Sequence, residues 1–118
     1  MDNTVTWFEV ATDDPEGAER FYGELFGWSF DKGGDGPLDY RLINYPGGQS
    51  GGGLFNTKGD LPAHAVFHVQ VADVEASCAK SESLGGKVVM KMIGADAGTD
   101  FAYLRDVSGS LFGIFRRR

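Results

Sequence analysis

The sequence predicts an α+β fold made of two β-α-β-β-β modules. The main observation is an internal repeat: Phe8 and Gly27 of one segment match Phe67 and Gly86 of a second, with 59 residues between matched positions (67 − 8). Self-similarity at a fixed offset indicates a duplicated structural unit. Each copy passes from a strand-like segment through an Asp that can cap a helix into a helical segment, and further strand-like segments follow.

We therefore expect one domain over residues 1–118, with the first module at about 4–57 and the second at about 63–117. Each module should place its helix on one apolar face of its sheet. The strands are expected to form a curved mixed sheet around a cleft, because the faces without helices are left to enclose a shared space.

The first strand is predicted over residues 4–10, where β-branched and aromatic side chains dominate. Side chains alternate between the faces of a strand, so Trp7 and Glu9 share one face and Phe8 and Val10 share the other. The repeat matches Glu9 to His68, a difference in chemistry at the same place in the two modules.

The first helix is predicted to begin after Asp14, with Pro15 in its first turn, and to end at Gly27. Its apolar residues recur at helical spacing in an amphipathic stripe, which consists of Ala18, Phe21, Tyr22, Leu25 and Phe26. Phe21 and Tyr22 are expected to pack in the core. Strands are expected at 28–30, 40–45 and 51–55. The intervening glycines do not indicate a phosphate-binding loop, because no Gly-Lys-Ser/Thr sequence opens a helix.

The second module is predicted to begin with a strand over 63–71 that carries His64, His68 and Gln70 on one face. Asp73 should cap a helix that runs to Leu84, although the apolar stripe of this helix is weak. The remaining strands are expected at 87–92, 101–105 and 111–115.

Composition excludes several classes of function. A formal net charge of −6 lacks the clustered Lys and Arg of a nucleic-acid-binding protein. The basic run Arg116-Arg117-Arg118 is expected to be a solvated tail. No apolar run is long enough to span a membrane, and no signal peptide is evident. A single cysteine, Cys78, allows no internal disulfide and is expected to be buried, so we expect a cytoplasmic protein.

Four segments resemble the vicinal oxygen chelate superfamily, which holds glyoxalases, extradiol dioxygenases, fosfomycin resistance transferases and bleomycin resistance proteins. They are residues 14–28, 71–76, 84–86 and 106–113, and the resemblance extends over nearly the whole chain. The Trp-Phe-Glu sequence of the first strand looks most similar to glyoxalase-like members. The resemblance implies the two-module fold described above, but this superfamily hosts many chemistries.

Members of this superfamily that bind a metal hold it with His or Glu side chains on the concave faces of the modules. The resemblance places those ligand positions at Trp7, Val66 and Gly113, and near Gly53, where no side chain offers a donor atom. His64 and His68 lie roughly 13 Å apart along a strand at ~3.3 Å per residue, too far to share one ion unaided. A displaced site at Glu9 and His68 would have at most two ligands. We therefore expect neither a metal nor another cofactor.

We expect the cleft to bind a small molecule, with Gly53 and Gly113 leaving space for it. The first hypothesis is acid–base chemistry of a lyase or isomerase, in which Glu9 and His68 transfer protons and Tyr103 stabilises an oxyanion. The ligand-binding residues expected beside them are Trp7, His64, Gln70, Phe101 and Arg105, the last of which could hold an anionic group.

Three alternatives remain open at this point. The cleft could sequester a cationic aromatic compound without turnover, as bleomycin resistance proteins do, with Trp7 and Phe101 stacking on it. It could belong to a metal-dependent lyase or dioxygenase. Glu9 and His68 could also be polar residues that only line an open, hydrated cleft. A homodimer is expected in each case, because superfamily members often pair their modules between chains and the sheet edges need cover.

Overall fold

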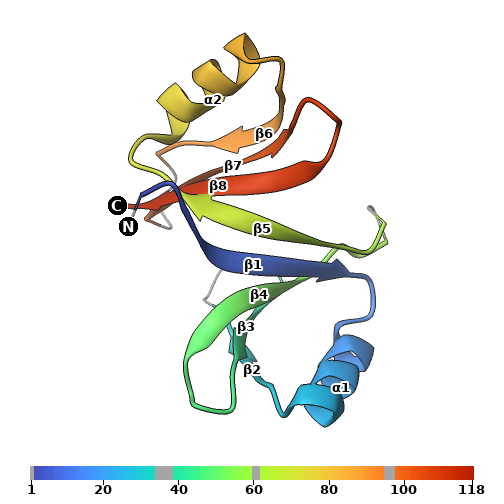
Figure 1. Ribbon diagram of the computed structural model, residues 1–118. Helices are drawn as coiled ribbons and strands as arrows, with labels where there is room; N and C mark the ends of the chain where they lie inside the picture. Colours follow the sequence, from blue (N-terminus) through green and yellow to red (C-terminus); the bar gives the residue numbers. More distant parts are fainter. Residues whose placement is uncertain (1, 34–38, 60–61, 95–97) are drawn as a thin grey trace. The chain divides into compact units, whose positions relative to one another are not determined.

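The computed structural model describes residues 2–33, 39–59, 62–94 and 98–118. The chain forms two compact units, drawn in Figure 1. The first module holds residues 7–65, and the second holds the N-terminal residues through Thr6 together with Val66–Arg118. Each contains one helix and a mixed sheet, so the α+β class and the β-α-β-β-β organisation are confirmed.

In the first module, the strand order is β2-β3-β4-β1, with β1 parallel to β4 and the other neighbours antiparallel. Ile43 and Leu54 are fully buried in its sheet. The predicted strands agree with the observed ones. The sequence also predicts a glycine-rich turn at 32–37, most of which lies outside the described residues. The elements are β1 (Thr4–Thr12), α1 (Pro15–Phe26), β2 (Ser29–Lys32), β3 (Tyr40–Asn44) and β4 (Ser50–Asn56).

In the second module, the strand order is β5-β8-β7-β6, with β5 parallel to β8. Its core joins α2 to the sheet through Val71, Val74, Cys78, Ala102, Leu104 and Ile114, so the predicted burial of Cys78 is confirmed. Burial raises the pKa of the Cys78 thiol. The elements are β5 (His64–Gln70), α2 (Val74–Ser83), β6 (Lys87–Met92), β7 (Thr99–Arg105) and β8 (Leu111–Arg117).

Both helices begin at the predicted caps. The Asp14 carboxylate accepts a hydrogen bond from the backbone N–H of Gly17 at 3.1 Å, and Asp73 accepts one from the N–H of Ala76 at 2.9 Å. Helix α1 ends at Gly27, whose φ of 75° places it in the left-handed region that glycine tolerates. No helix in the described part of the chain is both long and apolar enough to cross a membrane.

The predicted core packing of Phe21 is wrong, and two further members of the α1 stripe are also exposed. Phe21, Leu25 and Phe26 are 61%, 59% and 50% exposed. The side of α1 that faces the sheet is occupied instead by Tyr22, whose ring lies 5.5 Å from that of Trp28, and by Glu19, which pairs with Arg41 of β3. Helical spacing identified a stripe wider than the sheet beneath it can cover.

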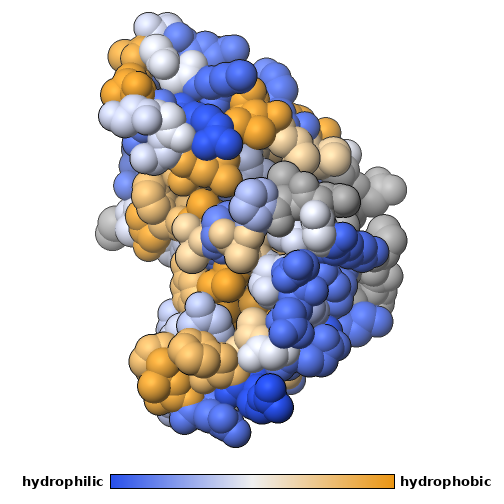
Figure 2. Space-filling model, turned by 90° about the vertical axis from the view of Figure 1, so that its right-hand side faces the viewer, coloured by the Kyte–Doolittle hydropathy of each residue, from blue (hydrophilic) through white to orange (hydrophobic). Residues whose placement is uncertain are grey.

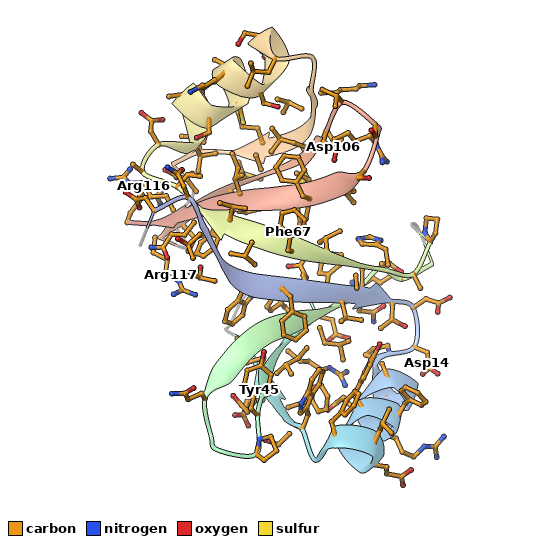
Figure 3. The ribbon with its side chains drawn as sticks, in the orientation of Figure 1. Asp14, Tyr45, Phe67, Asp106, Arg116 and Arg117 are labelled. Atoms are coloured by element: carbon orange, nitrogen blue, oxygen red, sulfur yellow. The ribbon has the colours of Figure 1, made fainter. Side chains whose placement is uncertain are left out.

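The C-terminal arginine run is exposed, as predicted, but it is held against the sheet and does not form a loose tail. Arg116 and Arg117 form the end of β8, where Figure 3 shows them. Arg118 pairs with the buried Asp100 of β7, Arg116 lies 3.8 Å from the same carboxylate, and the Arg118 N–H donates to the Gly98 carbonyl at 2.7 Å. Ion pairing and a backbone hydrogen bond therefore hold this segment against the sheet.

Candidate functional site

In the first module, Trp7 and Glu9 lie on the sheet face opposite α1, as the alternation predicted. Phe8 marks the helix side, because its ring lies 5.9 Å from Trp28. Glu9 is only 6% exposed, and its register partner on the parallel strand β4 is Gly53. The indole N–H of Trp7 donates a hydrogen bond to the hydroxyl oxygen of Tyr40 at 2.9 Å.

Tyr40 is a member of this face that the sequence analysis missed. Its phenol lies over Gly53: a Cβ atom added to this glycine would stand 1.8 Å from the Tyr40 hydroxyl oxygen. The space that Gly53 was expected to leave for a ligand is therefore filled by this ring. The β3–β4 hairpin pairs Tyr40 with Phe55, diagonal to Gly53, and an aromatic ring beside a strand glycine is a signal that could have revealed it.

The second module brings together His68, Tyr103 and Phe101 on the face opposite α2. The rings of His68 and Tyr103 meet edge-to-face at 5.4 Å, and those of Phe101 and Tyr103 meet at 6.0 Å. His68 is 5% exposed and stands in register with Gly113 of β8. A Cβ atom at Gly113 would lie 2.1 Å from the His68 Nδ1 atom, so the imidazole fills the space beside this glycine.

The other three predicted ligand-binding residues are engaged locally. A ring nitrogen of His64 lies 2.9 Å from the Pro62 carbonyl oxygen. The side-chain carbonyl of Gln70 lies 3.4 Å from the Thr6 hydroxyl. The Arg105 guanidinium donates to the Gly109 carbonyl at 2.9 Å, in the turn between β7 and β8. The roles predicted for these side chains, and the pairing of Glu9 with His68, stay predictions.

The residues at the superfamily's metal-ligand positions do not fit a metal. Trp7 uses its indole N–H for Tyr40, and Val66 is a buried apolar side chain. A longer side chain at Gly53 or Gly113 would collide with Tyr40 or His68. Within the described ranges, moreover, no three or more His, Cys, Asp or Glu side chains are grouped so that they could hold an ion.

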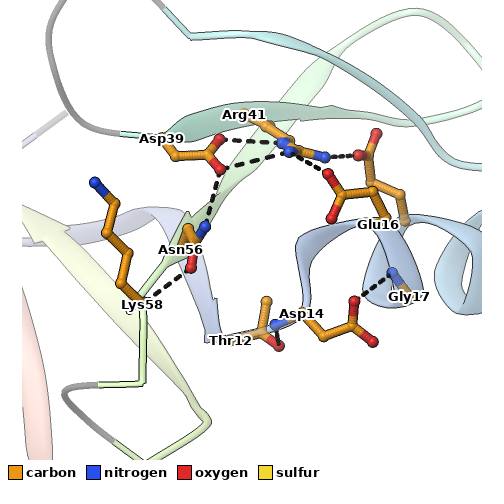
Figure 4. Close-up of polar contacts among 9 residues, drawn as sticks. Thr12, Asp14, Glu16, Gly17, Asp39, Arg41, Asn56 and Lys58 are labelled. Atoms are coloured by element: carbon orange, nitrogen blue, oxygen red, sulfur yellow. Dashed lines mark hydrogen bonds and ion pairs between the residues drawn. The ribbon is translucent and has the colours of Figure 1, made fainter.

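A charged network lies on the α1 side of the first module, and Figure 4 shows Arg41 at its centre. Arg41 bonds to Asp39, Glu16 and Glu19. Burial acts to lower the pKa of Arg41, but its hydrogen bonds to these carboxylates outweigh burial and raise that pKa. With three carboxylates around one guanidinium, this network is not a site for an anionic ligand.

Solved structures share this fold. A methylmalonyl-CoA epimerase variant of Streptomyces coelicolor, in complex with 2-nitronate-propionyl-CoA, matches with a TM-score of 0.70 and 14% identity over 99% of each chain. The hypothetical protein BH1468 of Bacillus halodurans matches with a TM-score of 0.72 and 13% identity, over 100% of this chain and 96% of that one. The methylmalonyl-CoA epimerase of Mycobacterium tuberculosis gives 0.66 and 16%, over 97% and 87%.

Sequence comparison gives the family. The protein named "Putative glyoxylase CFP32" in Mycobacterium bovis and Mycobacterium tuberculosis is 26% identical over 117 residues. The match takes in 96% of this chain but 44% of the relative, so the chain spans less than half the length of these relatives. The family model for the glyoxalase-like domain matches residues 7–115, nearly the whole chain. The chain therefore belongs to the glyoxalase-like domain family.

Proposed function

We propose that this chain binds a small carbonyl compound with an acidic C–H bond and that Glu9 and His68 transfer its proton. One observation carries the proposal: the repeat matches Glu9 to His68, and each stands beside a glycine in register on the last strand of its module. Both side chains are buried, at 6% and 5% exposure. Buried ionisable groups at equivalent places in a duplicated fold are costly to keep, which favours a chemical role over a merely hydrated surface.

The proposed reaction is an isomerisation through an enolate. One of the two groups, in its basic form, takes the proton as the C–H bond breaks, and the electron pair of that bond forms the enolate, with the charge on the carbonyl oxygen. The Tyr103 hydroxyl donates a hydrogen bond to this oxygen. The other group then gives a proton to carbon, and exchange with water restores both groups, so the substrate is neither oxidised nor reduced.

An acyl thioester is the first substrate class to test. The solved neighbours include methylmalonyl-CoA epimerases, one of them bound to methylmalonyl-CoA. Their sequence identity to this chain is low, so these structures support the fold alone. The choice of a thioester substrate for this chain is our own proposal. The residues at the superfamily's metal-ligand positions in this chain offer no donor atom for a metal, and no step in this proposal uses one.

The test is exchange of the substrate's α-hydrogen with solvent. Methylmalonyl-CoA and the hemithioacetal of methylglyoxal would be incubated with the protein in D₂O, and deuterium incorporation followed by mass spectrometry. We expect incorporation with the wild type and a loss of 100-fold or more, on the order of a lost general acid or base, in His68→Ala and Glu9→Gln. Imidazole should partly restore the His68→Ala variant.

The matched control is Glu82→Gln, which removes a carboxylate from the exposed surface of α2. Exchange that is unchanged in both site variants, or absent with both probes, would overturn the proposal. Quenching of Trp fluorescence by a probe without exchange would indicate binding alone, the function expected of a sequestering protein. The Trp7→Phe variant would assign that signal, since the chain has only two Trp residues.

We also propose that the protein is a homodimer and acts in the cytoplasm, where its single, buried cysteine would stay reduced. Light scattering at micromolar concentration should give twice the mass of the 118-residue chain. A single species with the mass of one chain would contradict the dimer.

A further inference from the structure

The first module carries an exposed aromatic surface that the proposed chemistry does not use. This aromatic patch consists of Phe21, Leu25 and Phe26 of α1 and Tyr45 after β3, which are 61%, 59%, 50% and 36% exposed. Figure 2 shows apolar side chains gathered over α1, and Figure 3 shows Tyr45 on the same module. Contiguous exposed apolar patches on soluble proteins mark sites of interaction.

The patch is continuous with a well-packed aromatic cluster beneath it. The ring of Tyr22 lies 5.3 Å from Phe21 and 6.4 Å from Phe26, and Trp28 lies 5.1 Å from Phe26 and 5.8 Å from Tyr45. The outer rings are therefore supported from below and need little ordering when they are covered. A rigid surface of this kind binds with a small entropy cost.

We infer that the aromatic patch is the interface through which two copies of this chain pair. This inference deepens the homodimer of the proposed function and rests on it. A two-fold interface must be complementary to itself, because the same surface is present on both sides. At the exposed side of α1, Arg20 and Glu24 lie one helical turn apart and carry opposite charges. In an antiparallel pair of α1 helices, Arg20 would face Glu24 of the partner subunit, and the pair would occur twice.

The charge of the chain disfavours other occupants. A net charge of −6 opposes binding to anionic lipid surfaces, and Arg20 is the only basic residue of α1. The sheet edges are weaker candidates for self-pairing. The outer strand β2 has only four residues, and β6 carries Lys87 and Lys91, which is how edge strands avoid pairing.

The first experiment compares two apolar-to-acidic substitutions by analytical ultracentrifugation of the full chain. Leu25→Glu lies in the patch, and the control Val107→Glu replaces a residue that is 77% exposed in the turn between β7 and β8. Leu25→Glu should raise the dimer Kd by about 100-fold or more, because each dimer contains the change twice. Val107→Glu should leave the Kd within about threefold of wild type.

The second experiment exchanges the two charges. Arg20→Glu and Glu24→Arg should each weaken the dimer about tenfold, and the double variant should restore it, because opposite charges again face each other. Thermal unfolding at a concentration below the dimer Kd would show that the monomers remain folded.

Three results would overturn the inference. One is a dimer that survives Leu25→Glu, and another is a dimer that the double charge exchange does not restore. In either case a dimer broken by Met92→Glu on β6 would keep the homodimer of the proposed function and move its interface to the sheet edge. The third is a wild type that stays monomeric at every concentration, which would refute the homodimer as well. Proton exchange on the substrate would be measured separately, so its failure is distinguishable from all three.

Discussion

The two modules fill the space beside an equivalent glycine in different ways. In the first, Gly53 lies under the phenol of Tyr40, which comes from β3. In the second, Gly113 lies under the imidazole of His68, the β5 residue that is the register partner of this glycine. Duplication has therefore kept the backbone register while the ring that covers it comes from another strand. Glu9, which the repeat matches to His68, is therefore not the residue whose ring covers the glycine in its module.

The two helices differ in how far their apolar residues are buried, and the difference is the reverse of what their sequences suggest. Helix α1 has the stronger apolar stripe but leaves Phe21 and Leu25 exposed, whereas α2 has a weak stripe and buries Val74 and Cys78 in the core of its module. Apolar spacing thus identifies which side of a helix is apolar. It does not report which partner provides the cover.

The largest expected effect is a difference in stability between alanine substitutions at the two glycines. Gly113→Ala should lower the free energy of unfolding by about 1–3 kcal/mol, as overpacking does, because the new Cβ would lie 2.9 Å from the His68 Cγ atom, close to the backbone and unable to swing away. Gly53→Ala should cost only about 1 kcal/mol, mainly the hydrogen bond between Trp7 and Tyr40, because the tip of the long Tyr40 side chain can move.

Urea denaturation of both variants gives these values, and Trp fluorescence should change with Gly53→Ala. Gly47→Ala is the matched control, since no atom lies within 4 Å of its added Cβ. A larger loss for Gly53→Ala than for Gly113→Ala would show that Tyr40, rather than His68, is the rigid ring.

A smaller effect should be equal in the two modules. Asp14→Ala and Asp73→Ala each remove a helix cap and should each cost about 1 kcal/mol of unfolding free energy. Asp13→Ala, which removes the neighbouring carboxylate, should change stability by no more than about 0.5 kcal/mol. Calorimetry of the three variants would check this, and a much larger loss at Asp73 would mean that α2 depends on its cap more than on its core.

The smallest expected effect is a dependence on acid, carried by one carboxylate in each module. The hydrogen bond from Asn56, with that from Arg41, lowers the pKa of Asp39, and the Gly94 N–H, with the charge of Arg118, lowers the pKa of Asp100. A carboxyl whose pKa is lower in the folded state stabilises the fold above its unfolded pKa of about 3.9, and the stabilisation is lost as pH falls through the folded value.

Stability should therefore decline below about pH 4. Asp39→Asn and Asp100→Asn should each be less stable than wild type at pH 7 and should lose less on acidification. Urea midpoints measured from pH 7 to pH 2 would test this. A variant that declines as steeply as wild type would show that its carboxylate is not responsible.

Local chemistry explains which features were predictable. The caps at Asp14 and Asp73 and the alternation that places Trp7 and Glu9 on one face depend on neighbours a few residues away. Tyr40 was missed because its contact with Trp7 joins residues 33 positions apart and depends on the register of three strands. The Arg118–Asp100 pair was missed for the same reason, since a run of charge does not show what lies opposite it.

The fit of His68 over Gly113 also limits how such a protein can evolve. The resemblance places a metal-binding carboxylate at position 113, yet any side chain there would occupy the space of the His68 ring. A carboxylate side chain at position 113 and an imidazole at position 68 therefore compete for the same space, so the effect of a substitution at one position depends on the residue at the other. We therefore expect an acidic side chain at position 113 to be tolerated only together with a smaller residue at position 68, so the order of the two substitutions would matter as much as their identity.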